Sequence, residues 1–385
     1  MKIHRKNIKY KYRRIGVGIT VFIAVLSLVL VNLPRAQASQ LNKKYSFIKT
    51  NYTVPTSNVA WVAPNGNDTS GNGSEGSPYA TFKKALSSIS NGGTVVAKSG
   101  IYREPHFFIS GDNVTIQAAP GAEVWLKGSD VVNSWTSENG IWKTTGNYHN
   151  FCHVCTTNAN PSVEGVAAYP EQVFINDEPL KQVKTKAEVT PGSNTFYVED
   201  NTPTTLKTPN NNADGYNIGQ QDAISYYIGK NPASGVTEIS ERARAFTSTG
   251  KNVSVKGINV AQYSPVQVWG FKDPYDPAAE RGVYSGPTAV SINGTGSLVQ
   301  DMIVTQSASQ GLFFNKAESS TARGVKAIDN GGSGVGANKS HNTVFTNGEL
   351  YGNNAEGFLT IGCGAYCTMA DIKVTHTRNF TFRNN

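Results

Sequence analysis

The sequence predicts an all-β protein built as a solenoid, in which short coils of strands stack on one another. The first indication is a 23-residue period in the last third of the chain. Two sets of residues share this spacing: Gly311, Gly334 and Gly357, each before an apolar residue, and Leu298, Thr321 and Val344, at the start of β-rich runs. The second is composition, with 38 glycines and only 16% charged residues, which favours turn-rich β-structure. Because one such coil cannot bury its own apolar face, coils of this kind must stack.

The turn before each repeated glycine carries a small polar residue, Ser307, Asn330 or Asn353. Asparagine tolerates left-handed backbone, and stacked amides at a bend can hydrogen-bond to one another. We therefore interpret Asn330 and Asn353 as parts of a structural ladder, with strands paired in register. The repeated leucines of a leucine-rich horseshoe, which has a similar period, are absent.

The net charge of +8 does not indicate a nucleic-acid-binding protein, because of where the charge lies. The first 38 residues contain no acidic residue and eight basic ones: Lys2, Arg5, Lys6, Lys9, Lys11, Arg13, Arg14 and Arg35. The remainder of the chain is therefore formally neutral. A basic surface of the kind that nucleic-acid-binding domains use is not expected on it.

Residues 1–38 have the three parts of a signal peptide: a basic start, an apolar run at 15–31, and the small-residue cleavage site Ala36-Gln37-Ala38. We expect a secreted or cell-surface protein. The alternative is an uncleaved membrane anchor, since the apolar run is at the short limit for a spanning helix. Any contact with a membrane is expected only through this segment.

The four cysteines form two close pairs, Cys152 with Cys155 and Cys363 with Cys367. Outside the cytoplasm such pairs favour disulfides. The alternative is a zinc site that uses both pairs, since His149 and His153 lie beside the first pair. The spacing of Cys363 and Cys367 is not that of common zinc motifs, so no metal site is assigned.

From Asn58 the chain gains regular patterns. Strands are predicted at 58–63 and 94–97, separated by a Gly/Asn/Ser loop and by a short amphipathic helix at 81–89. The stretches WVAPNGNDTSGNGSEGSPYATFKKAL and GGTVVAKSGIYRE resemble the N-terminal segment of secreted right-handed parallel β-helix proteins of the pectate-lyase-like superfamily. The resemblance extends over most of 59–145 and 247–385. It implies that the helix caps the open end of the first coil, which a solenoid requires.

The coil pattern lapses between Gly146 and Phe246, where paired short strands flank turns such as Asn176-Asp177-Glu178. These are hairpin signals, so we predict an inserted antiparallel β module. Related proteins often have glycine in this first turn, and its absence here leaves the turn type open. The predicted organisation is a signal peptide at 1–38, a linker at 39–58, an N-terminal cap and first coils at 59–145, the antiparallel module at 146–246, and further coils at 247–385, which end in mid-coil as if truncated.

The coil period is interrupted twice after residue 247. The segment VQVWGFKDPYDPAAERGVYSG, within 265–287, contains no coil. Asn342 and Asn379 begin similar runs 37 residues apart, so a second insertion lies near GCGAYCTMADIK. Because insertions leave a solenoid on one side and can build a groove there, both are candidate functional regions.

The first interruption contains the richest group of chemically active side chains. Its candidate catalytic residues are Asp273, Glu280 and Arg281, and its candidate sugar-stacking residues are Trp269, Tyr275 and Tyr284. A glycoside hydrolase requires two carboxyl groups across the scissile bond, whereas a lyase requires a base and cations that offset uronate charge. This loop contains the residue types for either chemistry. The alternative is a solvated turn without a catalytic role.

Several weaker candidates lie elsewhere. Asp329, Lys339, His341 and Glu356 lie at or near turns of the repeat, where surface residues are common. Asp68 and Glu75 are oxygen donors for Ca²⁺, but their spacing lacks the alternation of a calcium loop, so no cofactor is firmly implied.

Nucleophile-elbow, zinc-protease and nucleotide-binding motifs are absent. The family resemblance implies a carbohydrate-active protein, with lyase, hydrolase and epimerase activity left open. The expected partner is a polysaccharide, and a monomer is expected. The alternative is a non-catalytic glycan-binding, structural or adhesin-like surface solenoid.

Overall fold

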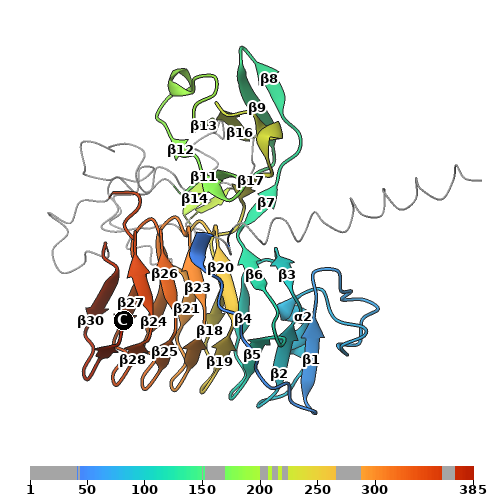
Figure 1. Ribbon diagram of the computed structural model, residues 1–385, viewed down its shortest axis with the longest axis vertical. Coiled ribbons are helices and arrows are strands. Elements are labelled where there is room, and N and C mark those ends of the chain that lie inside the picture. The colour runs from blue at the N-terminus through green and yellow to red at the C-terminus, as the bar shows by residue number, and fades with distance from the viewer. Residues whose placement is uncertain are drawn as a thin grey trace, which may run out of the picture.

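The computed structural model describes residues 41, 44–149, 151, 170–199, 207–209, 216–218, 224–265, 288–357 and 369–385. Within these ranges the chain forms a right-handed parallel β-helix with three parallel sheets, from which an antiparallel module projects (Figure 1). Each complete coil contributes one strand to each sheet in turn. The predicted fold class is therefore confirmed.

The three sheets of the solenoid are numbered in the order in which a coil passes through them. Sheet 1 consists of β1 (Val59–Val62), β2 (Thr94–Ala97), β5 (Thr115–Ala118), β19 (Ser254–Lys256), β22 (Leu298–Gln300), β25 (Thr321–Arg323), β28 (Val344–Thr346) and β31 (Thr381–Arg383). Sheet 2 consists of β3 (Gly100–Tyr102), β6 (Val124–Lys127), β20 (Ile258–Ala261), β23 (Ile303–Thr305), β26 (Lys326–Ile328) and β29 (Glu349–Tyr351). Sheet 3 consists of β4 (Phe107–Ile109), β18 (Phe246–Ser248), β21 (Thr288–Ile292), β24 (Gln310–Asn315), β27 (Val335–Asn338) and β30 (Ile372–Thr375).

The register of these sheets follows the sequence period. Leu298 pairs with Thr321, which pairs with Val344, and Val344 pairs with Thr381 across the longer step of 37 residues. Val255 pairs directly with Val299, so the segment between them contains one coil and a long excursion. Both interruptions of the period are confirmed as insertions into single coils.

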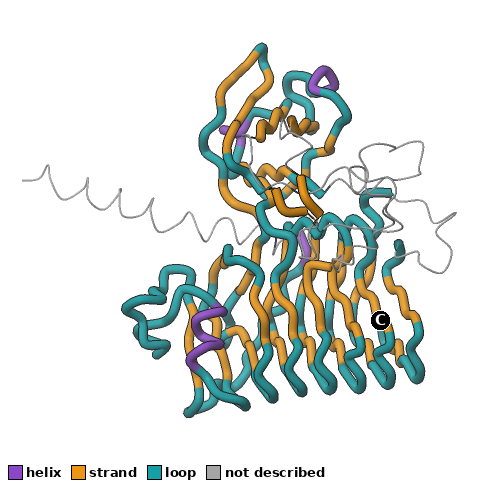
Figure 2. Tube along the Cα trace, turned by 180° about the vertical axis from the view of Figure 1, so that it is seen from behind, coloured by secondary structure: helices purple, strands orange, loops and turns teal. Residues whose placement is uncertain are grey.

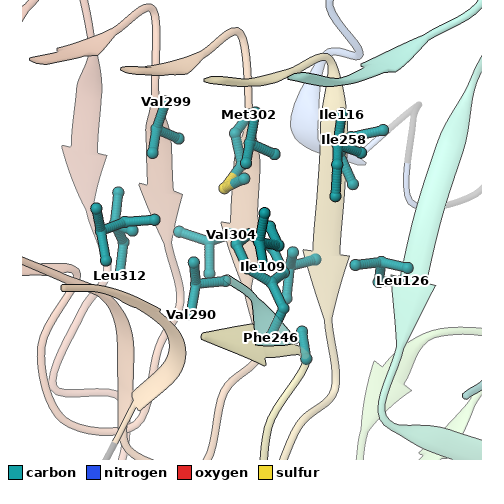
Figure 3. Close-up of a cluster of buried hydrophobic side chains, with 14 of the residues drawn as sticks. Ile109, Ile116, Leu126, Phe246, Ile258, Val290, Val299, Met302, Val304 and Leu312 are labelled. Atoms are coloured by element: carbon teal, nitrogen blue, oxygen red, sulfur yellow. The ribbon is translucent and has the colours of Figure 1, made fainter. Parts of the chain in front are cut away.

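Alternation along each strand builds the core. In β24, Leu312 and Phe314 point inward and are buried, whereas Phe313 between them points outward. Inward residues of all three sheets meet along the axis, as Figure 3 shows for Val290, Met302 and Leu312 and their neighbours. Full burial of an apolar side chain of this size stabilises the folded protein by about 1.5–3 kcal/mol. Because every coil buries side chains in this way, each added coil contributes a similar stabilisation.

The helix α2 (Phe82–Ser88) closes the first coil (Figure 2). Its N-cap Thr81 accepts a hydrogen bond from the Lys84 backbone N–H at 3.1 Å. Phe82 and Ala85 face inward and are fully buried against the core. The predicted helix at 81–89 and its capping position are therefore confirmed.

Among the described residues, the antiparallel module contains two main sheets and two short 3-10 turns. One sheet has the order β11 (Glu178–Pro179), β10 (Val173–Ile175), β17 (Thr237–Ser240) and β7 (Ser129–Val131). The other has the order β12 (Lys181–Gln182), β13 (Thr195–Glu199), β16 (Ile224–Ile228), β9 (Ile141–Gly146) and β8 (Thr136–Glu138). The short elements are the pair β14 (Lys207–Pro209) and β15 (Tyr216–Ile218), with η1 (Lys186–Glu188) and η3 (Pro232–Ser234).

The module differs from the predicted insertion in two respects. It begins at Ser129 rather than at Gly146, because β7, β8 and β9 pair antiparallel inside it. β13 pairs antiparallel with β16, a fully buried strand farther along the chain, so this pair is not a local hairpin. The first hairpin forms as predicted. Asn176 and Asp177 both have positive φ, 54° and 62°, so the tight turn needs no glycine.

The segment before β1 was expected to be a linker, but it lies along the outer face of sheet 2. Leu41 and Tyr45 are buried against outward-facing apolar side chains of that sheet, including Ile303 and Ile328. The Tyr45 hydroxyl donates to Asp329 Oδ2 at 3.2 Å. This segment has no period because it belongs to no coil, yet the apolar row on sheet 2 requires a cover.

Candidate functional site

The connection from sheet 2 to sheet 3, here called the 2–3 corner, receives the long insertions of three coils. They follow β6, β20 and β29 and lead to β18, β21 and β30. The coils between them cross the corner in short connections, from Thr305 to Gln310 and from Ile328 to Val335. The one comparable loop elsewhere among the described residues, at 63–81, lies at the N-terminal end and leads into α2 (Figure 1). The three insertions therefore leave and rejoin the solenoid beside one edge of sheet 3.

One row of outward-pointing side chains runs along that face, one residue from each coil. In register they are Phe108, Thr247, Ser291, Phe313, Gly336 and Lys373. A Cβ atom at Gly336 would lie 2.3 Å from the ring of Phe313, so that aromatic ring covers the glycine of the next coil. Phe108 is 59% exposed at the other end of the row. The face thus offers exposed aromatic surface, which is a common platform for sugar rings.

Glu356 is a carboxyl group of the 2–3 corner whose pKa is strongly perturbed. Its backbone N–H donates to the Gly331 carbonyl at 3.2 Å, so it lies above the preceding coil. A Cβ atom at Gly331 would lie 2.9 Å from Glu356 Cγ and 2.2 Å from the Ala308 carbonyl oxygen, and only glycine leaves this space open. Burial raises the pKa of Glu356 to about 7. A carboxyl group that is still partly protonated near neutral pH has the property required of a general acid.

A second perturbed carboxyl group lies where the module returns to the solenoid. Burial raises the pKa of Glu241 to about 7, although its Oε2 atom accepts a hydrogen bond from the His149 backbone N–H at 2.8 Å. Next to it, Arg242 forms a two-pronged ion pair with Asp130 at 2.9 and 3.1 Å. Glu241 and Glu356 belong to opposite ends of the corner, roughly four strand spacings or ~19 Å apart. That separation exceeds the ~5–9.5 Å between the two carboxyl groups of a glycosidase.

A buried network of charged residues joins the module to the corner. Lys127 Nζ lies 2.6 Å from both Asp177 Oδ1 and Glu238 Oε2, and all three side chains are almost completely buried. Arg103 also pairs with Glu238. Two cations therefore balance two carboxylates.

Amides complete this network. Gln262 Nε2 donates to Asp177 Oδ1 at 3.0 Å, and Gln306 Nε2 donates to the Asp177 carbonyl at 2.7 Å. Burial raises the pKa of Asp177 despite the nearby Lys127. Burial opposes ionisation of Glu238 as well, but Lys127 and Arg103 together hold its pKa below its usual range. Because every member binds another member, this network positions the module rather than offering a free acid or base.

The main candidate residues from the sequence lie outside the described residues. These are the proposed catalytic residues Asp273, Glu280 and Arg281, the proposed stacking residues Trp269, Tyr275 and Tyr284, and the four cysteines Cys152, Cys155, Cys363 and Cys367. Described residues on either side of the first group, Pro265 and Thr288, both lie at the 2–3 corner. The roles of these residues and the cysteine pairing stay predictions.

The weaker candidates are separated by the fold. Asp329 accepts the Tyr45 hydroxyl beside sheet 2, and Glu356 lies at the 2–3 corner. Lys339 and His341 lie together at the connection from sheet 3 to sheet 1. Asn330 and Asn353 form the predicted ladder, with Asn330 Nδ2 donating to Asn353 Oδ1 at 2.9 Å.

Asp68 and Glu75 do not converge on a cation in the described structure. Both carboxylate oxygens of Asp68 accept hydrogen bonds at the start of α2, from the Ala80 N–H at 2.7 Å and from the Thr81 hydroxyl at 2.7 Å. Among the described residues, no group of three or more His, Cys, Asp or Glu side chains is placed to hold a metal ion. In the same part of the chain, no helix is long and apolar enough to span a membrane.

The buried network has only a weak signature in the sequence. Lys127 stands at the end of the apolar run VWLK, and a charge in such a strand is a weak indication of a buried partner. Its partners Asp177 and Glu238 are 50 and 111 residues away. No local pattern could have connected them.

Comparison with solved structures agrees with the architecture. No protein-family model matches the chain, and no curated protein matches it. The complex of XylC with xylose is similar at a TM-score of 0.64 and 17% identity, over 85% of this chain and 58% of that one. A glycoside hydrolase is similar at a TM-score of 0.52 and 13% identity, over 86% of this chain and 77% of that one. The chain thus spans little more than half the length of XylC, and at these identities the likeness establishes the parallel β-helix fold.

Proposed function

We propose that this protein is an exported carbohydrate-active enzyme that hydrolyses a glycosidic bond of an extracellular or cell-wall polysaccharide bound along the outer face of sheet 3. The observation that supports it best is that three long insertions begin and end at the 2–3 corner, beside a face on which Phe108 is exposed and Phe313 is partly exposed. Solenoid enzymes need such additions because the regular coils supply only a flat wall. The two similar solved structures, one named a glycoside hydrolase and one holding xylose, support a hydrolase over a lyase.

In this proposal Glu356 is the general acid. Its pKa of about 7 keeps a proton available for the leaving oxygen at neutral pH. The ionised partner required by either hydrolytic mechanism would come from Asp273 or Glu280, in the insertion that begins at this corner. Trp269 and the tyrosines of that insertion would add stacking surface.

The test uses the full chain and a panel of neutral and uronic-acid polysaccharides. Reducing ends report hydrolysis, and ultraviolet absorbance reports the unsaturated ends that a lyase leaves. We expect new reducing ends without unsaturated product, and a loss of at least about 100-fold in kcat for Glu356→Gln. Glu349→Gln is the matched control, because Glu349 is an exposed carboxylate on sheet 2, 3.2 Å from Lys326. Unsaturated product, or full activity of Glu356→Gln, would overturn the hydrolytic assignment.

A non-catalytic glycan-binding solenoid is the second candidate function. It is favoured by one observation: Glu356 is too far from Glu241, a perturbed carboxyl group at the other end of the corner, for the two to act across one bond. Binding of a glycan without any product from the panel would support this candidate and exclude the enzyme.

A further inference from the structure

The connections from sheet 3 to sheet 1, here called the 3–1 corner, carry two columns of mostly basic side chains in the last three coils. The first column is Lys316, Lys339 and His376, and the second is Glu318, His341 and Arg378. Strand pairing fixes this stacking, because Asn315 pairs with Asn338 and Asn338 pairs with Thr375 immediately before the first column. Together the columns line a shallow depression of about 740 Å³.

The cations of this depression are exposed and lack carboxylate partners. Lys316, Lys339 and Arg378 form no salt bridge with any other residue that the structure describes. Glu318 is the single acidic residue of the lining. Counting Lys, Arg and Glu alone, the lining has three cations and one carboxylate, which gives the depression a net positive charge.

The backbone provides an independent observation. Lys316, Lys339 and His376 have φ values of 56°, 51° and 50°, in the left-handed region. This conformation is unfavourable for residues with a Cβ atom and is usually occupied by Gly, Asn or Asp. At the neighbouring left-handed position of the same corner, two of the three coils follow that rule with Asn342 and Asn379, and the third has Ser319. Long basic side chains therefore stand where folding alone would favour asparagine, which points to a role outside folding.

The histidines are oriented by their neighbours. His341 Nδ1 accepts the Arg378 backbone N–H at 3.0 Å, so in the neutral ring the proton is on Nε2, which is left as a donor. His376 Nδ1 bonds to Asn338 Oδ1 at 3.1 Å. The column positions repeat at the strand spacing of about 4.7–4.9 Å, which is shorter than the screening length of about 8 Å at physiological salt. Adjacent coils therefore act on an anion together.

We infer that this depression is a binding site for an acidic polysaccharide that lies along the solenoid axis, with one anionic group opposite each coil. The coil step is close to the length of one pyranose ring with its glycosidic oxygen. It does not match the axial rise between successive phosphates of one strand in duplex DNA, about 3.4 Å. The anionic character is derived from the corner itself, while the choice of a polysaccharide rests on the proposed function. The site is separate from the 2–3 corner, because sheet 3 lies between the two.

The test measures binding rather than cleavage. Polygalacturonate, a sulfated dextran, neutral dextran and a double-stranded DNA fragment are compared by affinity electrophoresis or calorimetry at low and at physiological salt. We expect binding of one or both acidic glycans, weakening as salt rises, and none of neutral dextran. The carboxylated and sulfated probes show which anionic group fits. DNA bound as tightly as either acidic glycan would overturn the proposal.

The variant Lys316→Asn/Lys339→Asn removes two cations and relieves two left-handed residues. We expect thermal stability equal to or above that of the wild type, together with about tenfold weaker binding, since each exposed ion pair changes an equilibrium constant by up to about fivefold. Glu318→Gln should strengthen binding by about twofold or more. The matched control is Lys184→Asn/Lys230→Asn, which removes the same charge from bends of the antiparallel module.

The binding and cleavage assays test the depression and the proposed hydrolase separately. Lysine-dependent binding of an acidic glycan without cleavage of any glycan would support the depression as a site and exclude the enzyme. Cleavage of a neutral glycan with equal affinity of wild type and double variant for every acidic probe would exclude the site and leave the enzyme standing.

Discussion

Replacing Lys127 with methionine is expected to destabilise the protein strongly, although the two side chains are similar in size. The Lys127 ammonium is buried 2.6 Å from two carboxylates, those of Asp177 and Glu238. Its removal leaves Arg103 as the single cation of the network opposite two buried carboxylates. Removing one partner of a buried ion pair costs about 3–5 kcal/mol, because the remaining charge has neither water nor partner.

The change is measured as thermal unfolding by circular dichroism, with a decrease in Tm of about 5 °C or more. Lys181→Met is the matched control, because Lys181 is exposed on the module, and its effect should stay within about 0.5 kcal/mol. A second substitution, Asp177→Asn, restores the charge balance of the network. Asparagine tolerates the left-handed backbone of that position and keeps the oxygen that accepts Gln262, so the double variant should recover about half of the loss.

The cost of Lys127→Met should also depend on pH. Burial already raises the pKa of Asp177 in the folded protein, and loss of Lys127 raises it further. The folded variant then binds a proton that the unfolded chain releases above about pH 4, so its stability falls as pH rises toward the raised pKa. The difference from wild type is therefore smaller at pH 5 than at pH 8. A Lys127→Met protein within about 1 kcal/mol of wild type, or further destabilisation by Asp177→Asn, would refute this account of the network.

Three further predictions concern the ladder, the candidate acid and the N-terminal segment. Asn330→Ala leaves the Val304 carbonyl without its donor at 3.2 Å and should lower the free energy of unfolding in urea by about 1–3 kcal/mol, whereas no change would remove the ladder's structural role. Activity that depends on protonated Glu356 should decrease above about pH 7, and a flat pH profile between pH 6 and 9 would contradict its role as general acid. Tyr52→Phe removes the hydroxyl that donates to Asp301 at 2.5 Å and should lower the free energy of unfolding in urea by about 1–2 kcal/mol. No measurable change would indicate that the segment is a free linker.

The repeat determined how much of the fold could be predicted. Stacked coils place equivalent residues directly above one another, so the spacing of Leu298, Thr321 and Val344 is also their pairing register. Interruptions of the 23-residue spacing also predicted the positions of the two insertions after residue 247. The N-terminal segment was missed as a packed element because Tyr45 and Tyr52 contact the solenoid through single side chains without a period.

The candidate site was less predictable for a physical reason. The 2–3 corner collects chain from segments far apart in the sequence, and the pKa of Glu356 depends on burial, which no local pattern records. The basic columns of the 3–1 corner became visible only when register placed Lys316 beside Lys339 and Lys339 beside His376. Lys339 and His341 were therefore recognised singly from the sequence, but not as members of one surface.

The long excursion between β6 and β18 also determines the order in which the protein can assemble. In sheet 3, β4 has β18 as its one neighbouring strand, so β4 stays unpaired until Phe246 has been synthesised. Chain elongation delivers the whole antiparallel module before that moment, and the module has an apolar core of its own. Once the module has folded, the chain between β6 and β18 is compact, so a shorter flexible loop must close before β18 can pair with β4. Slow formation of the module would delay every later coil while leaving the finished solenoid unchanged.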